Sequence, residues 1–248
     1  MERLISRAAE ALSRSRMTAV STGAGISRES GIPTFRGSDG IWKKHKPEEL
    51  ASREGFLSDP ALVWKWYRQR LFTAREKEPN PGHRALVEME SVIPSLTVIT
   101  QNVDNLHRRA GSSDVVELHG NIERFKCLER SHPVEFDPRW GDEPPCCSVC
   151  GSLVRPDIVW FGESLPRKEL EYAFDISSRS DTFLIVGTSG LVQPAAHLPL
   201  LAKRNGATLI EINVSESALT GLVDIFLEGR SGEILPGIMD ELNKSGSG

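Results

Sequence analysis

The 248-residue sequence has few cysteines, no long apolar run and little excess of charge of one sign. Its four cysteines all fall between residues 127 and 150, which argues against a disulfide framework and for a local metal site. No run approaches the roughly 18 apolar residues of a membrane span, and the N-terminal residues lack the apolar segment of a secretory signal. A net charge of −4 gives no electrostatic argument for binding nucleic acid or an anionic membrane. We expect a protein of a reducing, cytoplasmic compartment.

What the sequence does contain is an alternation of strand-like and helical segments. Apolar runs typical of strands lie at 17–22, 96–100, 115–118, 182–186, 208–212 and 224–227. Helical patterns separate most of them, at 60–75, 83–91, 105–110, 167–178, 195–205 and, at the end, 232–243. Such alternation is typical of a parallel sheet covered on both faces by helices. The sequence therefore predicts an α/β protein with one sizeable core.

The most informative segment is 23–37, directly after the first strand. Gly23 and Gly25 allow the backbone to turn sharply and to approach a ligand closely. Residues 27–30 are expected to open a helix, whose free N–H groups attract phosphate. Arg28 stands where a dinucleotide fingerprint has a third small residue, so this signal alone also fits a surface loop. The unusual sequence Pro33-Thr34-Phe35-Arg36-Gly37 favours a nucleotide site instead.

Polar residues also follow the other predicted strands. Gln101, Asn102 and Asp104 come after the second strand, and His119 comes after the third. Because ligands of such sheets bind at the carboxyl ends of the strands, we expect these side chains to line one site. Asp104 could instead cap the next helix, and His119 could be a structural histidine. Their clustering favours a site in which His119 is a general base.

These motifs together resemble those of the sirtuin family, in the same order along the chain. They are Gly23-Ala24-Gly25-Ile26-Ser27, Gly31-Ile32-Pro33-Thr34-Phe35-Arg36, Thr100-Gln101-Asn102-Val103-Asp104, Leu118-His119-Gly120, Val159-Trp160-Phe161-Gly162-Glu163 and Gly187-Thr188-Ser189. The resemblance covers residues 3–243. It implies an NAD-dependent deacylase acting on acylated lysines of proteins, which releases nicotinamide and O-acyl-ADP-ribose.

The resemblance also implies how the chain is divided. A Rossmann-type, doubly wound parallel sheet that binds NAD would comprise residues 1–36, 93–120 and 157–248. A helical insertion with the acyl pocket would occupy residues 37–92, and a small zinc-binding lobe residues 121–156.

Roles for individual residues follow from the same resemblance. The expected catalytic residues are His119, Asn102 and Asp104, with His119 taking the proton of a ribose hydroxyl. Residues expected to contact NAD are Gly23, Ala24, Gly25, Ile26, Ser27, Thr34, Phe35, Arg36, Trp42, Gln101, Asn102, Val103, Asp104, Gly187, Thr188, Ser189, Asn213, Val214, Ser215 and Ser231. The segment Val159, Trp160, Phe161, Gly162 and Glu163 is expected to pair with the substrate backbone, as in β-augmentation.

The cysteines contain one clear half of a zinc site. Cys147-Ser148-Val149-Cys150 is a CxxC knuckle, and Cys127 lies upstream, but Arg130 stands where the sirtuin pattern has a ligand. Cys146 is the favoured fourth ligand and His132 a weaker candidate. We therefore expect a structural zinc held by Cys127, Cys146, Cys147 and Cys150. A lobe that has lost its metal and folds by packing alone is the alternative.

The helical insertion carries a candidate determinant of acyl specificity. Tyr67 and Arg70 are three residues apart, hence neighbours on one helix face. They resemble the pair with which class III sirtuins hold a carboxylate, a task that suits the guanidinium fork. Ala51 matches the floor of the acyl pocket and leaves room for a diacid. We expect removal of succinyl, malonyl or glutaryl groups, with acetyl removal as a weaker or parallel activity.

The sequence also allows other interpretations of the helix and of the function. The Tyr67–Arg70 helix could simply be amphipathic, with Tyr67 buried and Arg70 in solvent. The chain could be mainly a deacetylase, transfer ADP-ribose, or bind NAD or acyl-lysine without catalysis. A conventional NAD dehydrogenase is disfavoured by Arg28 and by the lack of the ribose-binding acid of that pattern.

Overall fold

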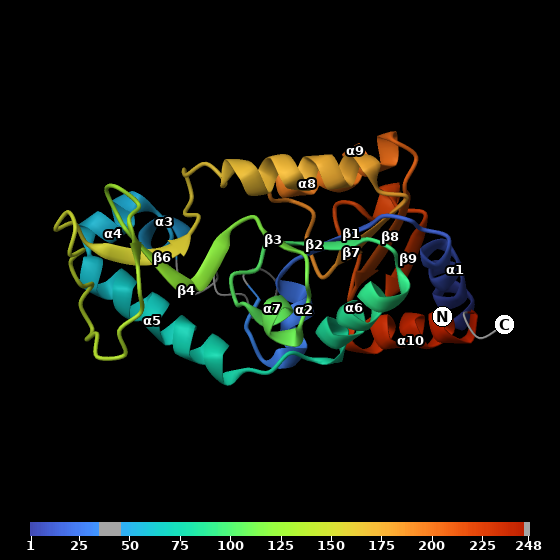
Figure 1. Ribbon diagram of the computed structural model, residues 1–248, viewed down its shortest axis with the longest axis horizontal. Helices are drawn as coiled ribbons and strands as arrows, with labels where there is room; N and C mark the ends of the chain where they lie inside the picture. Colours follow the sequence, from blue (N-terminus) through green and yellow to red (C-terminus); the bar gives the residue numbers. More distant parts are fainter. Residues whose placement is uncertain (35–45, 246–248) are drawn as a thin grey trace.

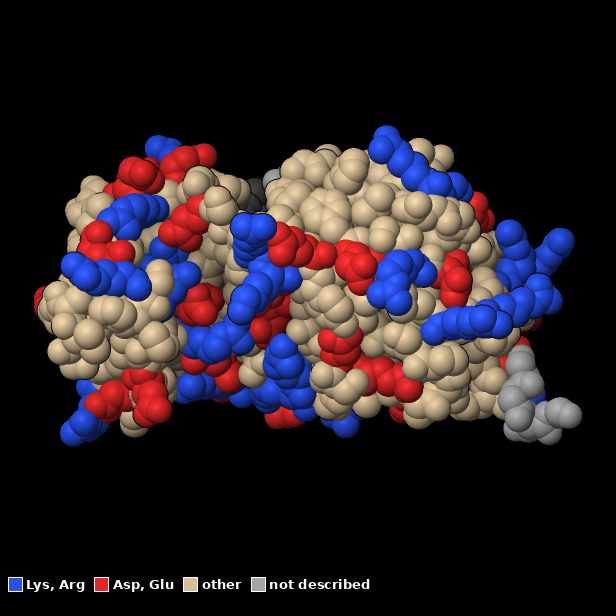
Figure 2. Space-filling model, turned by 45° about the horizontal axis from the view of Figure 1, so that its top comes forward, with Lys and Arg blue, Asp and Glu red and all other residues tan. Residues whose placement is uncertain are grey.

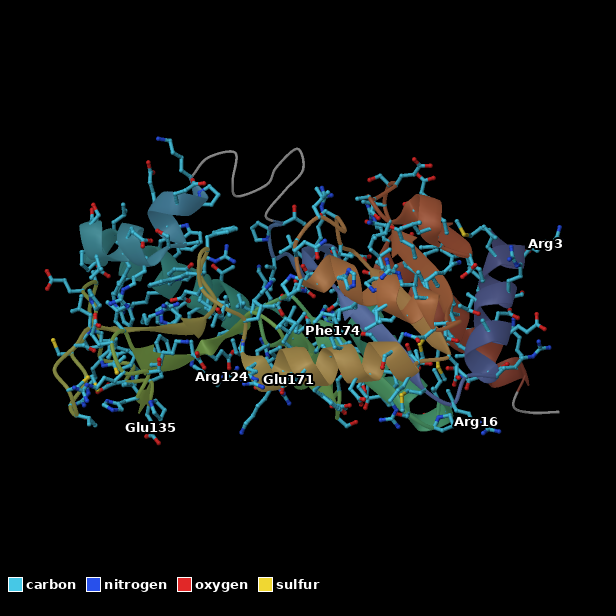
Figure 3. The ribbon with its side chains drawn as sticks, turned by 90° about the horizontal axis from the view of Figure 1, so that it is seen from above. Arg3, Arg16, Arg124, Glu135, Glu171 and Phe174 are labelled. Carbon is cyan, nitrogen blue, oxygen red and sulfur yellow. The ribbon has the colours of Figure 1, made fainter. Side chains whose placement is uncertain are left out.

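The computed structural model describes residues 1–34 and 46–245. Two lobes lie side by side, a large one around a parallel sheet and a small one around three strands and three helices (Figure 1). Seen from above, Glu135 marks the small-lobe end of the molecule, and Arg3 and Arg16 mark the opposite end (Figure 3). Basic and acidic side chains are interspersed over both lobes on the face displayed in Figure 2.

The large lobe has a six-stranded sheet in the order β3-β2-β1-β7-β8-β9, with every neighbouring pair parallel. The strands are β1 (Thr18–Thr22), β2 (Leu96–Thr100), β3 (Val115–Glu117), β7 (Thr182–Val186), β8 (Thr208–Asn213) and β9 (Ile225–Glu228). Numbered within this sheet alone, the order is 3-2-1-4-5-6, that of dinucleotide-binding folds. The chain reverses direction across the sheet between β1 and β7, where such folds bind their ligands. The predicted doubly wound α/β class is confirmed.

Helices cover both faces of this sheet (Figure 1). One face carries α1 (Glu2–Ser13), α6 (Pro81–Val92) and α10 (Ser231–Ser245), whose apolar residues form one core cluster with the strands. The other face carries α8 (Arg167–Arg179) and α9 (Leu198–Arg204), which enclose a second cluster. The short α7 (Leu106–Ala110) lies beside α6. Aliphatic residues on both faces explain why the predicted strands match the observed ones to within about a residue.

The small lobe combines segments from two distant parts of the chain. Its antiparallel sheet has the order β5-β4-β6, from β4 (Gly120–Cys127), β5 (Pro133–Val134) and β6 (Val154–Ile158). Its helices are α3 (Pro47–Leu50), α4 (Arg53–Ser58) and α5 (Pro60–Glu76). Side chains of both groups share one core, so residues 47–76 and 120–158 pack as a single unit.

The helix after β1 begins earlier than the sequence suggested. Helix α2 spans Ala24–Ser27, and a 3₁₀ turn follows at Arg28–Ser30. Gly25 therefore lies inside the first helical turn rather than in the loop before it. No helix within the described residues is long and apolar enough to cross a membrane.

Candidate active site

The segments that follow β1 and β7 are in close backbone contact at glycine residues. The N–H of Gly25 donates to the carbonyl of Gly187 over 2.8 Å. A Cβ on Gly25 would lie 2.6 Å from the Cα of Gly187, and one on Gly23 would lie 2.8 Å from the Gly187 carbonyl oxygen. No side chain fits these contacts, so the glycines serve close packing of two chain segments. Their packing leaves the start of α2 at the switch point of the sheet.

A cavity of about 1340 Å³ opens at this edge and extends to the small lobe. Most of the predicted site residues line it: Gly23, Ala24, Gly25, Thr34, Ala51, Tyr67, Arg70, Gln101, Asn102, Val103, His119, Val159, Trp160, Phe161, Gly162, Glu163, Gly187, Thr188, Ser189, Asn213, Val214, Ser215 and Ser231. Phe35, Arg36 and Trp42 lie outside the described residues. Ile26, Ser27 and Asp104 are buried behind the wall of the cavity.

Asn102 and Asp104 are joined through Ser27. The Asn102 amide donates to the Gly23 carbonyl over 3.0 Å and to the Ser27 hydroxyl over 3.2 Å. That hydroxyl donates in turn to the Asp104 carboxylate over 2.7 Å. Asp104 also accepts the N–H of Leu106 at the start of α7, so its capping role and its place in this network coexist. Burial raises the pKa of Asp104, partly offset by these hydrogen bonds.

His119 lines the cavity with one ring nitrogen already engaged. Its Nδ1 lies 2.9 Å from the carbonyl oxygen of Gln101. A carbonyl only accepts, so Nδ1 carries the proton and Nε2 of the neutral ring keeps its lone pair. Burial lowers the pKa of His119, with the Gln101 hydrogen bond as a smaller opposing effect. A neutral imidazole with a free lone pair can accept a proton from a ligand hydroxyl.

Two residues expected to contact NAD, Asn213 at the end of β8 and Ser231 at the start of α10, form hydrogen bonds within the protein itself. The Asn213 amide donates to the Thr188 carbonyl over 2.9 Å and so fixes the turn after β7. The Ser231 hydroxyl donates to Glu29 over 3.2 Å, which ties the start of α10 to the turn after α2. Both residues still line the cavity.

The small lobe contributes a side-chain pocket to the same cavity. Ala51, Tyr67 and Arg70 all line it, so Arg70 does not lie on the solvated outer face of α5. The Tyr67 hydroxyl accepts a hydrogen bond from the Trp160 indole over 3.1 Å. Burial raises the pKa of Tyr67 and lowers that of Arg70. The tyrosine is therefore a neutral hydroxyl, and the arginine remains a cation because its ordinary pKa is so high.

The segment expected to pair with substrate is anchored by Arg155 of β6. This guanidinium binds both oxygens of Glu163, and the second of them also accepts the N–H of Trp160 over 2.9 Å. The Phe161 N–H donates to the Ala51 carbonyl over 2.8 Å. Glu163 thus holds its own segment in place, a task the sequence did not reveal.

A separate group of ligand-type side chains lies in the small lobe. Cys127, His132, Cys147 and Cys150 place their ligand atoms within 4.8 Å of one another. The backbone N–H of His132 donates to the Cys127 sulfur over 3.1 Å, which favours a thiolate. Three thiolates and one imidazole are a common donor set for structural zinc, so these residues fit that metal.

Cys146, the fourth ligand preferred from the sequence, is not in this group. Cys146 is exposed and pairs with Leu153 in an isolated antiparallel β-bridge, so its backbone is extended. Cys147, the next residue, is buried. Neighbouring residues of an extended chain point to opposite sides, so an inward Cys147 directs Cys146 outward. The structure thus corrects the expectation and places His132 in the fourth position.

Several cavity-lining residues were not predicted. Leu191, Val192 and Gln193 line it, together with Trp66 and Arg28. The first three follow Gly187-Thr188-Ser189 after one further residue, Gly190, so their short distance from the end of β7 indicated that they could line the site. Arg155 gave no such signal, because a lone arginine in a short strand does not indicate burial.

Comparisons with known proteins agree with this architecture. Residues 23–194 match the Sir2 family. An NAD-dependent protein deacylase of Pyrococcus abyssi is 49% identical, over 97% of this chain and 99% of its own.

Solved structures give the same result. A Sir2 homologue mutant in complex with ADP-ribose superposes with a TM-score of 0.92 at 42% identity, over 97% of each chain. Sir2Af2 bound to a myristoylated histone peptide has a TM-score of 0.82 at 37% identity, over 100% of this chain and 99% of its own. The chain therefore belongs to the Sir2 family of NAD-dependent protein deacylases.

Proposed function

We propose that this protein removes acyl groups from lysine side chains of proteins, with NAD as co-substrate. The observation that carries the proposal is the state of His119, which lines the cavity at the switch point of the sheet. Its Nδ1–H binds the Gln101 carbonyl, so Nε2, which has no hydrogen-bond partner among the described residues, keeps its lone pair. The cavity of about 1340 Å³ exceeds the roughly 300–1,000 Å³ of ordinary ligand pockets, which suits two substrates held together. NAD would supply the ADP-ribosyl group that receives the acyl group, with release of nicotinamide.

The residues divide this work between the ends of the cavity. Backbone groups around Gly25 and Gly187 would hold the phosphates, since they lie at a helix N-terminus and a strand end. Asn102, fixed by Ser27, would hold the nicotinamide end, with Asp104 behind it. His119 would take a proton from a ribose hydroxyl, with Gln101 beside it.

The adenosine part of NAD would lie at the end of the cavity away from His119. Asn213, Val214, Ser215 and Ser231 would line the adenosine end. Phe35, Arg36 and Trp42 remain predictions from the sequence.

Within this activity we assign a preference for negatively charged acyl groups. Ala51 leaves space beside Tyr67 and Arg70, and these two present a hydroxyl and a half-buried cation to the cavity. A guanidinium in a poorly solvated pocket attracts a carboxylate strongly. Succinyl, malonyl and glutaryl groups would place their terminal carboxylate there. Val159 to Glu163 would pair with the backbone of the acylated protein.

One assay tests the activity and its selectivity together. Nicotinamide release is measured with matched peptides that differ only in carrying acetyl-lysine or succinyl-lysine. We expect NAD-dependent turnover of both, with a higher kcat/KM for the succinyl peptide. A higher value for acetyl would make the protein mainly a deacetylase, and absence of nicotinamide release would leave a binding module.

In the small lobe we propose a structural zinc bound by Cys127, His132, Cys147 and Cys150. Four protein ligands would leave no open position for catalysis at the metal. All four cysteines of the chain are free thiols, and three of them belong to this group. Metal-binding thiols of this kind suit a reducing compartment such as the cytoplasm.

A further inference from the structure

The Tyr67 hydroxyl has one hydrogen-bond partner among the described residues, the indole N–H of Trp160 at 3.1 Å. Tyr67 is only 4% exposed, so water contributes little there. A hydroxyl that accepts from an N–H directs its own proton away from that donor. The side chain beside it on α5, Arg70, is a guanidinium, which cannot accept a hydrogen bond. The Tyr67 proton is therefore available to an acceptor that enters the cavity.

The position of Trp160 is in turn fixed from several sides. Its backbone N–H is bound by the Glu163 carboxylate, and the Arg155 guanidinium lies over its ring, 3.3 Å from the centroid. Phe56 packs on the ring at a centroid distance of 5.2 Å. Trp160 is 2% exposed. The indole N–H therefore has little freedom to turn away from Tyr67.

We propose that Trp160 is a specificity-determining positioning residue, which sets the Tyr67 hydroxyl as a hydrogen-bond donor toward the terminal carboxylate of a dicarboxylic acyl group. This inference rests on the proposed preference for negatively charged acyl groups. An acetyl group has no terminal carboxylate, so the indole N–H contributes to selectivity and little to turnover of neutral acyl groups. Arg155 and Glu163 act one step further away, by holding Trp160.

A double-mutant cycle tests the inference. Trp160→Phe keeps an aromatic ring but removes the N–H donor, and Tyr67→Phe removes the hydroxyl. The measured quantity is the ratio of kcat/KM for succinyl-lysine peptide to that for acetyl-lysine peptide. We expect each single variant to lower this ratio by roughly 3- to 10-fold, the scale of one hydrogen bond. The double variant should show no further loss beyond Tyr67→Phe alone, because the indole acts through the hydroxyl.

Trp64→Phe is the matched control. Trp64 lies in the same core and donates its indole N–H to the Gly141 carbonyl, away from the cavity. This variant should leave the ratio unchanged. If Trp160→Phe fails to fold, benzothienylalanine at position 160 keeps the shape of the indole and replaces only the N–H with sulfur.

Two different failures can be told apart. If Arg70→Met lowers kcat/KM equally for both peptides, the proposed acyl preference fails, and this inference with it. If Arg70→Met is selective but Trp160→Phe leaves the ratio unchanged, or its effect multiplies with that of Tyr67→Phe, Trp160 does not act through Tyr67 and the inference is overturned.

Discussion

The two lobes present different kinds of chemical group to the shared cavity. The large lobe offers backbone of Gly23 and Gly187 and short polar side chains at strand ends. The small lobe offers Tyr67, Arg70 and Trp160, which are large side chains held by packing. Under the proposed function, the large lobe holds the groups common to every acyl transfer and the small lobe selects the acyl group.

The lobes also differ in the kind of side chain that fills their hydrophobic cores. Among the described residues, the buried hydrophobic cluster under α1, α6 and α10 contains only aliphatic side chains and methionine. The small-lobe core instead contains Phe56, Trp64, Tyr67, Phe125 and Trp160. A three-stranded sheet has few core-facing side chains, so each of them must bury a large apolar area. Aromatic rings bury the largest areas. Removing one group from the small lobe should therefore disturb more of it.

The largest difference between the lobes should appear when the metal is removed. Structural zinc contributes about 10–16 kcal/mol to the folding of small domains. We expect chelation, or His132→Ala, to increase hydrogen exchange in β4 and α5 while β1 and β7 stay protected. Purified wild-type protein should hold about one zinc per chain, and His132→Ala much less. Cys146→Ser is the control and should keep its zinc; equal loss from both variants would contradict the assigned ligand set.

In the large lobe, the greatest effect should come from His119→Ala. General-base assistance is worth about 10²- to 10⁴-fold in rate, and we expect at least that loss of kcat on both acetyl and succinyl peptides. NAD binding, measured by calorimetry, should remain. Because the large lobe is proposed to serve all acyl groups alike, a loss confined to one peptide would contradict the proposed division of roles between the lobes.

A buried histidine pair should make stability of the large lobe sensitive to acid. His83 and His107 have ring centroids 4.8 Å apart, and burial lowers the pKa of His83 to about 4 and that of His107 as well. The unfolded value is about 6.5, so the native state holds fewer protons. Stability is then fully present above pH 6.5 and is lost as the pH falls toward 4, by about 3 kcal/mol for His83.

Denaturant unfolding between pH 7 and pH 5 measures this loss, above most of the carboxyl titrations. His83→Gln should flatten the dependence on pH in that interval. An unchanged slope would mean that His83 does not titrate as its burial implies.

The smallest effect expected is in the acyl pocket, and it should be selective. Arg70→Met removes the cation but keeps much of the apolar stem of the side chain. A charge-assisted hydrogen bond is worth about 1.5–3 kcal/mol, so kcat/KM for succinyl peptide should fall roughly 10- to 150-fold. Tyr67→Phe should change it less in the same direction. Acetyl peptide serves as the internal control and should be little affected; equal losses would place the selecting residues elsewhere.

Much of the large lobe could be predicted from the sequence. Its strands are continuous apolar runs because both faces are buried, and their ends are marked by Gly23, Asn102, His119 and Gly187. Parallel pairing aligns Thr22 with Thr100 and Val186, so the residues that follow emerge side by side. Periodicity and strand order are therefore sufficient to assemble this side of the cavity.

The small lobe was less predictable because its features depend on where side chains point. The choice between Cys146 and His132 depends on the local extended backbone, which composition does not reveal. The ion pair between the buried Arg155 and the half-buried Glu163 joins a residue without any motif to the last residue of the motif at 159–163. That residues 47–76 and 120–158 share one core is likewise a matter of packing between distant segments.

The interleaving of the lobes along the chain has a consequence for synthesis on the ribosome. All small-lobe segments have been made once Trp160 has left the exit tunnel, but α1 packs against α10, the last helix of the chain. The apolar face of α1 must therefore wait for nearly the whole polypeptide before it is covered, and exposed apolar surface of this kind promotes aggregation. We expect nascent chains stopped just after residue 165 has emerged from the tunnel to contain a partly ordered small lobe and an incomplete sheet that needs chaperone protection.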